Sequence, residues 1–139
     1  MKIPLETALA FVEDHHRAVL LTHKSQGGMQ MSPVVAGVDA ERLLIVSTRR
    51  KTAKVANIRR DRRVSLLVLG DGFFGPWVQL DGEAFLLEGP DAIEALVDYY
   101  KRVAGEHPDW DRYRQAMVEE DRLLIRIRAE AAAGPAALQ

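Results

Sequence analysis

Three apolar segments follow one another with very short connections, and this spacing limits the folds open to the chain. The segments are 17–23 (RAVLLTH), 29–38 (MQMSPVVAGV) and 42–47 (RLLIVS). Residues 24–28 and 39–41 connect them, whereas a parallel pair of strands needs a crossover of a dozen or more residues. The spacing therefore predicts an antiparallel meander that begins with a hairpin at a Gly-Gly turn.

The remaining periodicity predicts helices grouped late in the chain and three further strands. Helices are expected at 4–14, about 52–60, 89–106 and 107–121, and strands at 63–69, 77–88 and 122–128. Gly82 marks a bulge or a tight bend, and the weakly patterned tail 129–139 is expected to be loosely held. The fold class is mainly β (α+β), a six-stranded antiparallel barrel with appended helices in one domain, 1–139; an open α+β sandwich is the alternative.

Composition narrows the class of protein. Apolar residues make up 47% of the chain and charged residues 28%, with a net charge of −1 and no cysteine. This excludes disulfides and thiolate chemistry, and it gives no general attraction to nucleic acid or anionic membrane. The N-terminal segment has no signal-peptide pattern and no apolar run is long enough to span a bilayer, so a cytoplasmic protein is expected.

Residues 43–69 contain a strand, a basic turn, the start of a helix and another strand. The unpaired amides at a helix N-terminus favour an anion, because they carry the positive end of the helix dipole. Thr52 offers a hydroxyl, and Lys51 and Lys54 offer charge to the same oxygens. The segment therefore predicts a phosphate site, with a solvated basic helix as the alternative.

The same region is strongly basic in a chain that is close to neutral. Residues 49–63 hold eight Lys or Arg and one acid, Asp61, while acids concentrate in 81–94 and 106–121. This asymmetry predicts one anion-binding face. The acids Glu119, Glu120 and Asp121 lie at a helix end and are interpreted as solvated.

Two further groups are candidates for contact with a flat ring system. Ser32, Pro33 and Val34 lie in a strand where proline predicts an edge or a bulge, which leaves backbone groups free to bond a polar ring. Trp77 and Gln79 share a strand face, so a stacking ring and an amide could meet a planar heterocycle; a core or interface position for Trp77 is the alternative.

No set of residues has the spacing of a catalytic or metal centre. His15 and His16 are adjacent, no HxxxH or HxH pair occurs, and no GxSxG motif is present. The glycine-rich loop 70–76 does not open a helix, and its Phe73 and Phe74 are expected to pack against a partner subunit or to cover a ligand. Catalytic side chains and metal ligands are therefore not predicted.

The order of these segments resembles a known family. RKTAKVANIRRDRRVSLLV resembles the phosphate-binding unit of the pyridoxamine 5'-phosphate oxidase-like, flavin-binding split-barrel superfamily. YYKRVAGEHPDWDRYRQAMVEEDRLLIRI resembles its actinobacterial branch, which uses the deazaflavin coenzyme F420 or FMN. Together with LLTHKSQGGMQMSPVV and WVQLDGEAFLL, these segments cover nearly the whole chain.

The resemblance implies a split-barrel homodimer with cofactor clefts at the subunit interface. It places Ser32, Pro33 and Val34 along the cofactor ring, Trp77 and Gln79 in the cleft from the other subunit, and Asn57 in a structural helix position. The phosphate-contacting group that it implies is Ser47, Thr48, Lys51, Thr52 and Lys54. Thr52 departs from the family, in which this position often carries Arg, and the tail lacks the family's short segment after the last strand.

The function implied is an F420-dependent oxidoreductase that transfers a hydride between the deazaflavin and a small planar organic substrate, without a protein nucleophile. An FMN flavoprotein of the same fold is one alternative. A non-catalytic protein that carries the cofactor, or that binds haem or another anion, is the other. Nucleic acid and membrane are not expected partners.

Overall fold

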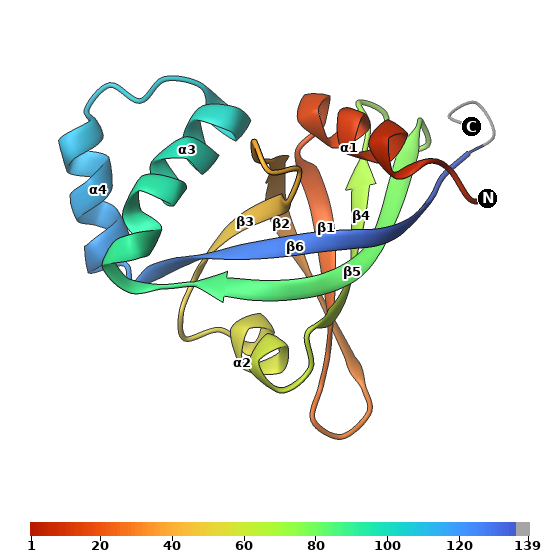
Figure 1. The fold of residues 1–139 in the computed structure, drawn as a ribbon, viewed down its shortest axis with the longest axis horizontal. Coiled ribbons are helices and arrows are strands. Elements are labelled where there is room, and N and C mark those ends of the chain that lie inside the picture. The colour runs from red at the N-terminus through yellow and green to blue at the C-terminus, as the bar shows by residue number, and fades with distance from the viewer. Residues whose placement is uncertain (136–139) are drawn as a thin grey trace.

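The computed structural model describes residues 1–135 and shows a closed six-stranded barrel with the strand order β1-β2-β3-β6-β5-β4 (Figure 1). The strands are β1 (Arg17–His23), β2 (Met29–Val38), β3 (Leu44–Arg49), β4 (Arg63–Leu69), β5 (Trp77–Leu87) and β6 (Arg122–Ala133). The helices are α1 (Leu5–Asp14), α2 (Ala53–Arg60), α3 (Ile93–Ala104) and α4 (Trp110–Glu119), with a 3-10 turn at Gly89–Ala92 before α3. None of these helices combines the length and the apolar character that a membrane-spanning helix requires.

Every strand pair in the barrel is antiparallel, as the short connections predict. β1, β2 and β3 are consecutive neighbours, and the pairing of β1 with β4 closes the cylinder. Closure excludes the open sandwich that the sequence left as an alternative.

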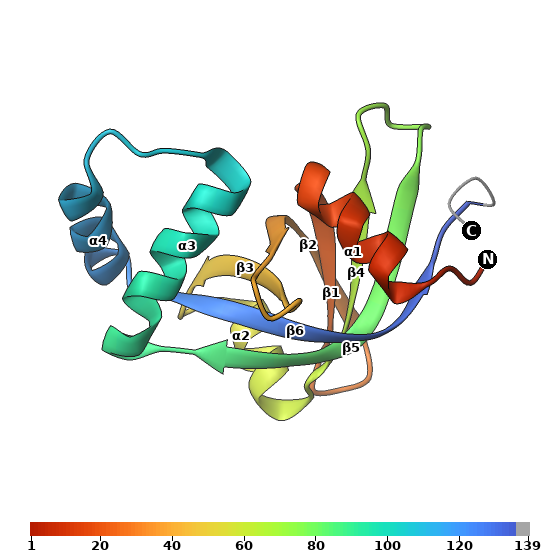
Figure 2. The ribbon, with the colours of Figure 1, turned by 45° about the horizontal axis from the view of Figure 1, so that its top comes forward.

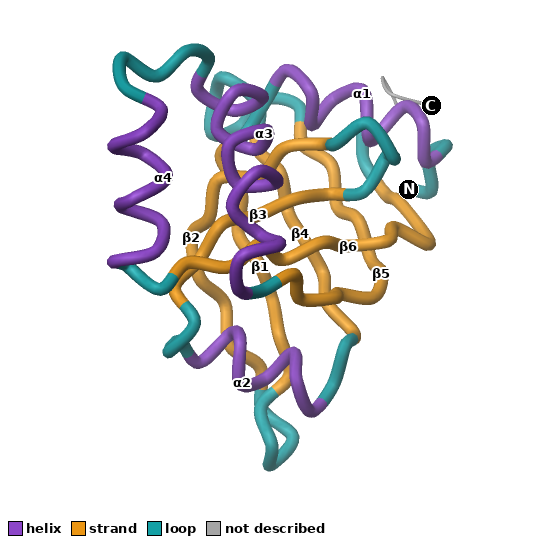
Figure 3. The backbone as a smooth tube through the Cα atoms, turned by 60° about the vertical axis from the view of Figure 1, so that its left-hand side comes forward, coloured by secondary structure: helices purple, strands orange, loops and turns teal. Residues whose placement is uncertain are grey.

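The core fills the barrel and is completed by a helix at each end. Alternate side chains of each strand point inward, for example Leu20, Leu66 and Leu80, all of which are buried. Figures 1 and 3 show α1 across one end of the barrel and α2 across the other, where Leu9 and Ile58 join the same core.

The helix pair α3–α4 stands beside the barrel and forms a second apolar cluster with it (Figure 3). Ile45 of β3 and Leu124 of β6 point outward from the barrel and are buried beneath Leu96 and Tyr113 of the two helices. α3 and α4 form the connection between β5 and β6, and they pack beside the β3–β6 pair.

The last strand is longer than the sequence pattern predicts, which corrects one expectation. Residues 129–133 are not loosely held: they continue β6 and pair with the first half of β5. The register shifts where Asp81 faces Ala131 and Gly82 faces Ala129, so that Glu130 is the extra residue of a bulge. This confirms the irregularity predicted at Gly82, where a Cβ would collide with the carbonyl oxygen of Arg128. Residues 136–139 of the predicted tail lie outside the described residues.

The barrel is split between β2 and β3. These strands pair only from Ala36 opposite Val46 to Val38 opposite Leu44. The seven preceding residues of β2, 29–35, pair only with β1. The residues of β3 that follow Val46, 47–49, pair only with β6. The two backbones therefore diverge beyond Ala36 and Val46, and this divergence creates the site described next.

Candidate functional site

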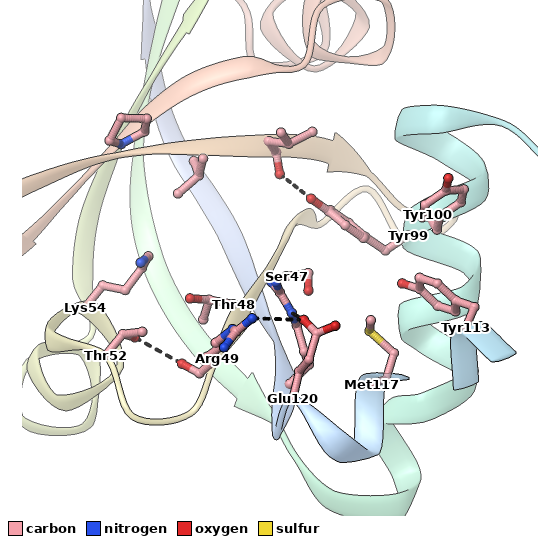
Figure 4. A pocket seen from close by; sticks show the side chains of 14 residues that line it. Ser47, Thr48, Arg49, Thr52, Lys54, Tyr99, Tyr100, Tyr113, Met117 and Glu120 are labelled. Carbon is pink, nitrogen blue, oxygen red and sulfur yellow. Dashed lines mark hydrogen bonds and ion pairs between the residues drawn. The ribbon is translucent and has the colours of Figure 1, made fainter. Parts of the chain in front are cut away.

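A cleft with a volume of about 600 Å³ occupies the split between β2 and β3. If the β2–β3 register continued, Val35 would face Ser47 and Val34 would face Thr48. Instead, the strands separate here and all four residues line the cleft, with Ser47 and Thr48 on its β3 side (Figure 4). The lining residues come from β2, β3, the turn into α2, and the α3–α4 pair with the start of β6: Pro33, Val34, Val35, Ser47, Thr48, Arg49, Thr52, Lys54, Tyr99, Tyr100, Tyr113, Met117, Glu120 and Arg122.

The β2 wall is a free strand edge and contains no bulge. The pairing of β1 with β2 runs from Arg17–Val35 to His23–Met29 without a register shift, so of the alternatives predicted at Pro33 the edge is confirmed and the bulge is wrong. Pro33 suits this edge because it has no N–H to leave unpaired. The Tyr99 hydroxyl donates a 2.7 Å hydrogen bond to the carbonyl of Val35, which a continuing β3 would otherwise have paired.

The opposite wall carries hydroxyls and an ammonium at the start of α2. Thr52 is the N-cap residue, but its hydroxyl donates to the carbonyl of Arg49 at 3.1 Å. It makes no capping bond within the described chain, so the first-turn amides of α2 stay open to another acceptor. Thr48 is buried and Lys54 is half-buried beside it (Figure 4). Hydroxyls, amides and a cation together form a donor set that suits a phosphate group.

Lys54 is half-buried and lies near a second cation, Arg122. Burial lowers the pKa of its ammonium group, and the Arg122 guanidinium lowers it further. A bound dianion would reverse both effects, because it replaces lost hydration and offsets the neighbouring positive charge.

Aromatic side chains of α3 and α4 form the third wall. Tyr100 and Tyr113 pack edge to face at 5.0 Å, and Trp110 joins them at 5.8 Å from Tyr100. The Tyr113 hydroxyl donates to the carbonyl of Leu96, and burial raises the pKa of Tyr113 to about 12. Sequence periodicity assigns Tyr100, Tyr113 and Met117 to the helix core stripe, and they do pack there while one side of each lines the cleft.

The basic face predicted from residues 49–63 is largely neutralised, which corrects that prediction. Acids from distant segments reach these arginines: Glu88 pairs with both Arg50 and Arg59, and Asp121 also pairs with Arg50. The other ion pairs are Arg49 with Glu120, Arg62 with Glu83, and Arg63 with Asp61. In the part of the chain that the structure describes, Lys51, Lys54 and Arg60 are the members of the cluster without an ion pair.

The acids at the end of α4 also differ from the prediction, because two of them are paired rather than solvated. Asp121 bonds Arg50 at 3.0 Å. Glu120 lies in the cleft and bonds Arg122 at 3.0 Å and Arg49 at 3.4 Å. Glu119 is exposed and accepts a hydrogen bond from Gln115.

The structure brings six of the ten predicted site residues to the cleft, namely Pro33, Val34, Ser47, Thr48, Thr52 and Lys54, and leaves four outside its lining. Lys51 is exposed in the turn. The Ser32 hydroxyl is buried without a hydrogen-bond partner among residues 1–135. Trp77 and Gln79 lie on the outer face of β5, and Gln79 donates to Asp81.

Asn57 has the surroundings of a structural residue. It is a buried residue of α2 and donates a 3.0 Å hydrogen bond to the hydroxyl of Thr22 in β1, which is also buried. Arg60 donates to its side-chain oxygen at 2.7 Å. Asn57 thereby holds α2 against β1 and fixes the position of the turn that carries Lys54.

A closed antiparallel barrel that is split between two strands, with appended helices, is the architecture of the split-barrel class of proteins. The chain belongs to the family described as pyridoxamine 5'-phosphate oxidase, whose sequence model matches residues 5–134. This confirms the resemblance seen in the sequence.

Solved structures show the same fold. A conserved hypothetical protein from Mycobacterium tuberculosis is 26% identical, with a TM-score of 0.73 over 91% of this chain and 80% of that one. A protein named F420 reductase is 20% identical, with a TM-score of 0.68 over 89% of this chain and 94% of that one. A haem-binding protein from Mycobacterium smegmatis is 17% identical, with a TM-score of 0.72 over 94% of this chain and 53% of that one.

Proposed function

We propose that the chain binds a phosphorylated flavin-like cofactor in the cleft, with coenzyme F420 as the first candidate and FMN as the second. The observation that carries this proposal is the placement of Thr48, Thr52 and Lys54 opposite the free β2 edge, in a chain of this family. The cofactor phosphate would accept hydrogen bonds from Thr48, Thr52 and Lys54, and the edge of the cofactor ring would face the backbone at Pro33 and Val34. The residues present fit both parts of such a ligand.

We further propose that the protein is an oxidoreductase acting on a small planar organic substrate. The cofactor, when bound, supplies the hydride chemistry, while the protein orients the two partners and excludes water. Tyr100, Tyr113 and Met117 form an apolar wall against which a flat substrate would pack, and the Tyr99–Val35 bond holds α3 beside the β2 edge. No protein nucleophile is needed for this chemistry.

The outer face of the barrel supports the proposal of a homodimer. Its strand register aligns apolar side chains across β2, β1, β4 and β5: Val19, Leu21, Met29, Met31, Val35, Leu67, Leu69 and Trp77. Met29 and Met31 are 59% and 67% exposed. An apolar surface of this extent is typical of a subunit interface. The apolar face borders the cleft at Val35, and we propose that a second copy packed on this face covers the cleft and contributes its own Trp77 and Gln79.

The loop between β4 and β5 extends this face. It projects beyond the barrel in Figure 2 and carries Phe73 and Phe74, which are 76% and 96% exposed. We propose that these rings pack against the second copy. Met31→Asp should convert a dimer to a monomer in light scattering, whereas Val118→Asp, equally exposed at 67% but on α4, should leave the mass unchanged.

Cofactor binding is tested by titrating the protein with F420, followed by fluorescence quenching, and with FMN, followed by absorbance. Saturable binding of F420 and hydride transfer to a quinone or enone acceptor would support the first proposal. A yellow protein that binds FMN instead would support the second candidate. Absence of binding to both at tens of micromolar would refute a flavin-like cofactor, and binding without transfer to any acceptor would favour the non-catalytic carrier.

A further inference from the structure

Glu120 is an acid inside a cleft proposed to bind an anion. It is the one carboxylate among the described residues that line the cleft, beside three cations, Arg49, Lys54 and Arg122. One oxygen, Oε1, accepts a 3.0 Å hydrogen bond from Nε of Arg122 and a 3.4 Å bond from Nη2 of Arg49. Figure 4 shows Glu120 beside Arg49 and across the cleft from Lys54.

The strand register explains why a carboxylate is needed at this point. Arg49 of β3 and Arg122 of β6 are direct cross-strand partners. Like charges at opposed positions repel, and Lys54 lies close enough to feel the Arg122 charge. Glu120 stands between the two guanidinium groups and reduces the formal charge of the cleft lining from three to two.

We infer that Glu120 is a specificity-determining residue that limits how much negative charge the cleft accepts. It engages both guanidinium groups as an internal anion, so a ligand phosphate meets a cleft of reduced positive charge. The inference rests on the proposed function, namely that the cleft holds a phosphorylated cofactor. The site so tuned suits a ligand with a single phosphate group and disfavours ligands with several adjacent phosphates.

Glu120→Gln isolates the charge from the shape of the side chain. Glutamine retains a carbonyl oxygen that accepts from Arg122, but it removes the negative charge. Glu119→Gln is the matched control, because it removes the same charge from the neighbouring residue, which is exposed and outside the cleft lining. FMN and riboflavin share one ring system and differ in the phosphate, so the pair separates effects on the phosphate from effects on the ring.

Glu120→Gln is expected to bind FMN about three- to tenfold more tightly than Glu119→Gln in fluorescence titrations, with a steeper loss of affinity as salt increases. Riboflavin should bind the two variants equally. Thermal unfolding of both variants verifies the fold, and Glu120→Ala should shift FMN affinity in the same direction. Unchanged or weaker FMN binding by both Glu120 variants would overturn the inference and make Glu120 a residue that positions the arginines.

Inorganic phosphate separates this inference from the proposed function. If the wild-type protein binds neither FMN nor F420, the proposed function fails. Calorimetric titration with phosphate then still compares Glu120→Gln with Glu119→Gln, and tighter binding by the first would uphold the charge limit for a simple anion. Equal phosphate binding by the two variants would overturn it.

Discussion

Lys54→Ala removes one of three cations that line the cleft and measures how much cofactor affinity depends on the phosphate group. With Glu120 present, the substitution halves the formal charge of the lining from two to one. The gross Coulomb attraction of a unit charge pair about 4 Å apart is roughly 4 kcal/mol at an effective dielectric constant of about 20. Desolvation and side-chain ordering reduce this to the net value of a charge-assisted hydrogen bond, about 1–3 kcal/mol. The dissociation constant should therefore rise roughly 5- to 150-fold.

The assay is a fluorescence titration with F420 or FMN, with Lys51→Ala as the matched control. Lys51 belongs to the same turn and carries the same charge, but it is exposed and lies outside the cleft lining. Its substitution should change affinity less than about twofold, because exposed charges are screened. Riboflavin affinity should stay the same in both variants. Equal losses in the two variants, or none in Lys54→Ala, would refute a phosphate site at the start of α2.

Three further predictions concern pH and stability. Burial and Arg122 lower the pKa of Lys54, so its ammonium group loses its charge at a lower pH than an ordinary lysine. Affinity for FMN should therefore fall as pH rises through this range, and the fall should be missing in Lys54→Ala. A parallel decline in riboflavin affinity would contradict this prediction. Gly82→Ala should lower the free energy of unfolding by about 1–3 kcal/mol in urea, because its Cβ would meet the Arg128 carbonyl, whereas Gly72→Ala in the open loop should be neutral. Asn57→Ala should cost about 1–3 kcal/mol by leaving the buried Thr22 hydroxyl without its donor, and a loss below about 0.5 kcal/mol would speak against its anchoring role.

Local sequence chemistry was sufficient for the antiparallel meander, and it narrowed the position of Pro33 to an edge or a bulge. Short connections permit only antiparallel neighbours, and Pro33 cannot donate to a ladder, but only the continuous β1–β2 register decides for the edge. The irregularity at Gly82 was likewise predicted from the residue type, and the structure explains it because a Cβ there has no room beside β6.

The Ala-rich extension of β6 could not be predicted in this way. Residues 129–133 lack an alternating apolar pattern, so side-chain periodicity indicates no strand. They become a strand because the first half of β5 offers backbone groups to pair with, and backbone pairing does not depend on side-chain pattern. The partner of this segment, near residue 80, is distant in sequence.

The charge of the basic turn was overestimated for a related reason. Arg50 meets Glu88 and Asp121, which are 38 and 71 positions away, so counting charges in a local window misses both partners. The same folding event that neutralises Arg50 and Arg59 leaves Lys54, beside Thr52, without an acid partner among residues 1–135. A charge-dense segment in the sequence thus becomes a much smaller electropositive site, in which Arg49 shares Glu120 with Arg122 beside Lys54.

The cleft itself arises from where pairing stops, and this is a property of two strands together. Neither 32–35 nor 47–49 shows in isolation that the β2–β3 register ends at Ala36 and Val46. Once it ends, the freed Val35 carbonyl needs a donor, which Tyr99 supplies, and the freed β3 edge faces solvent between α2 and α4. The α3–α4 pair therefore does more than cover apolar surface: it satisfies the backbone at the split and brings Glu120 to the arginines. A ligand in this cleft would contact the barrel and the helix pair at once, so its affinity should depend on the docking of α3 as well as on Lys54.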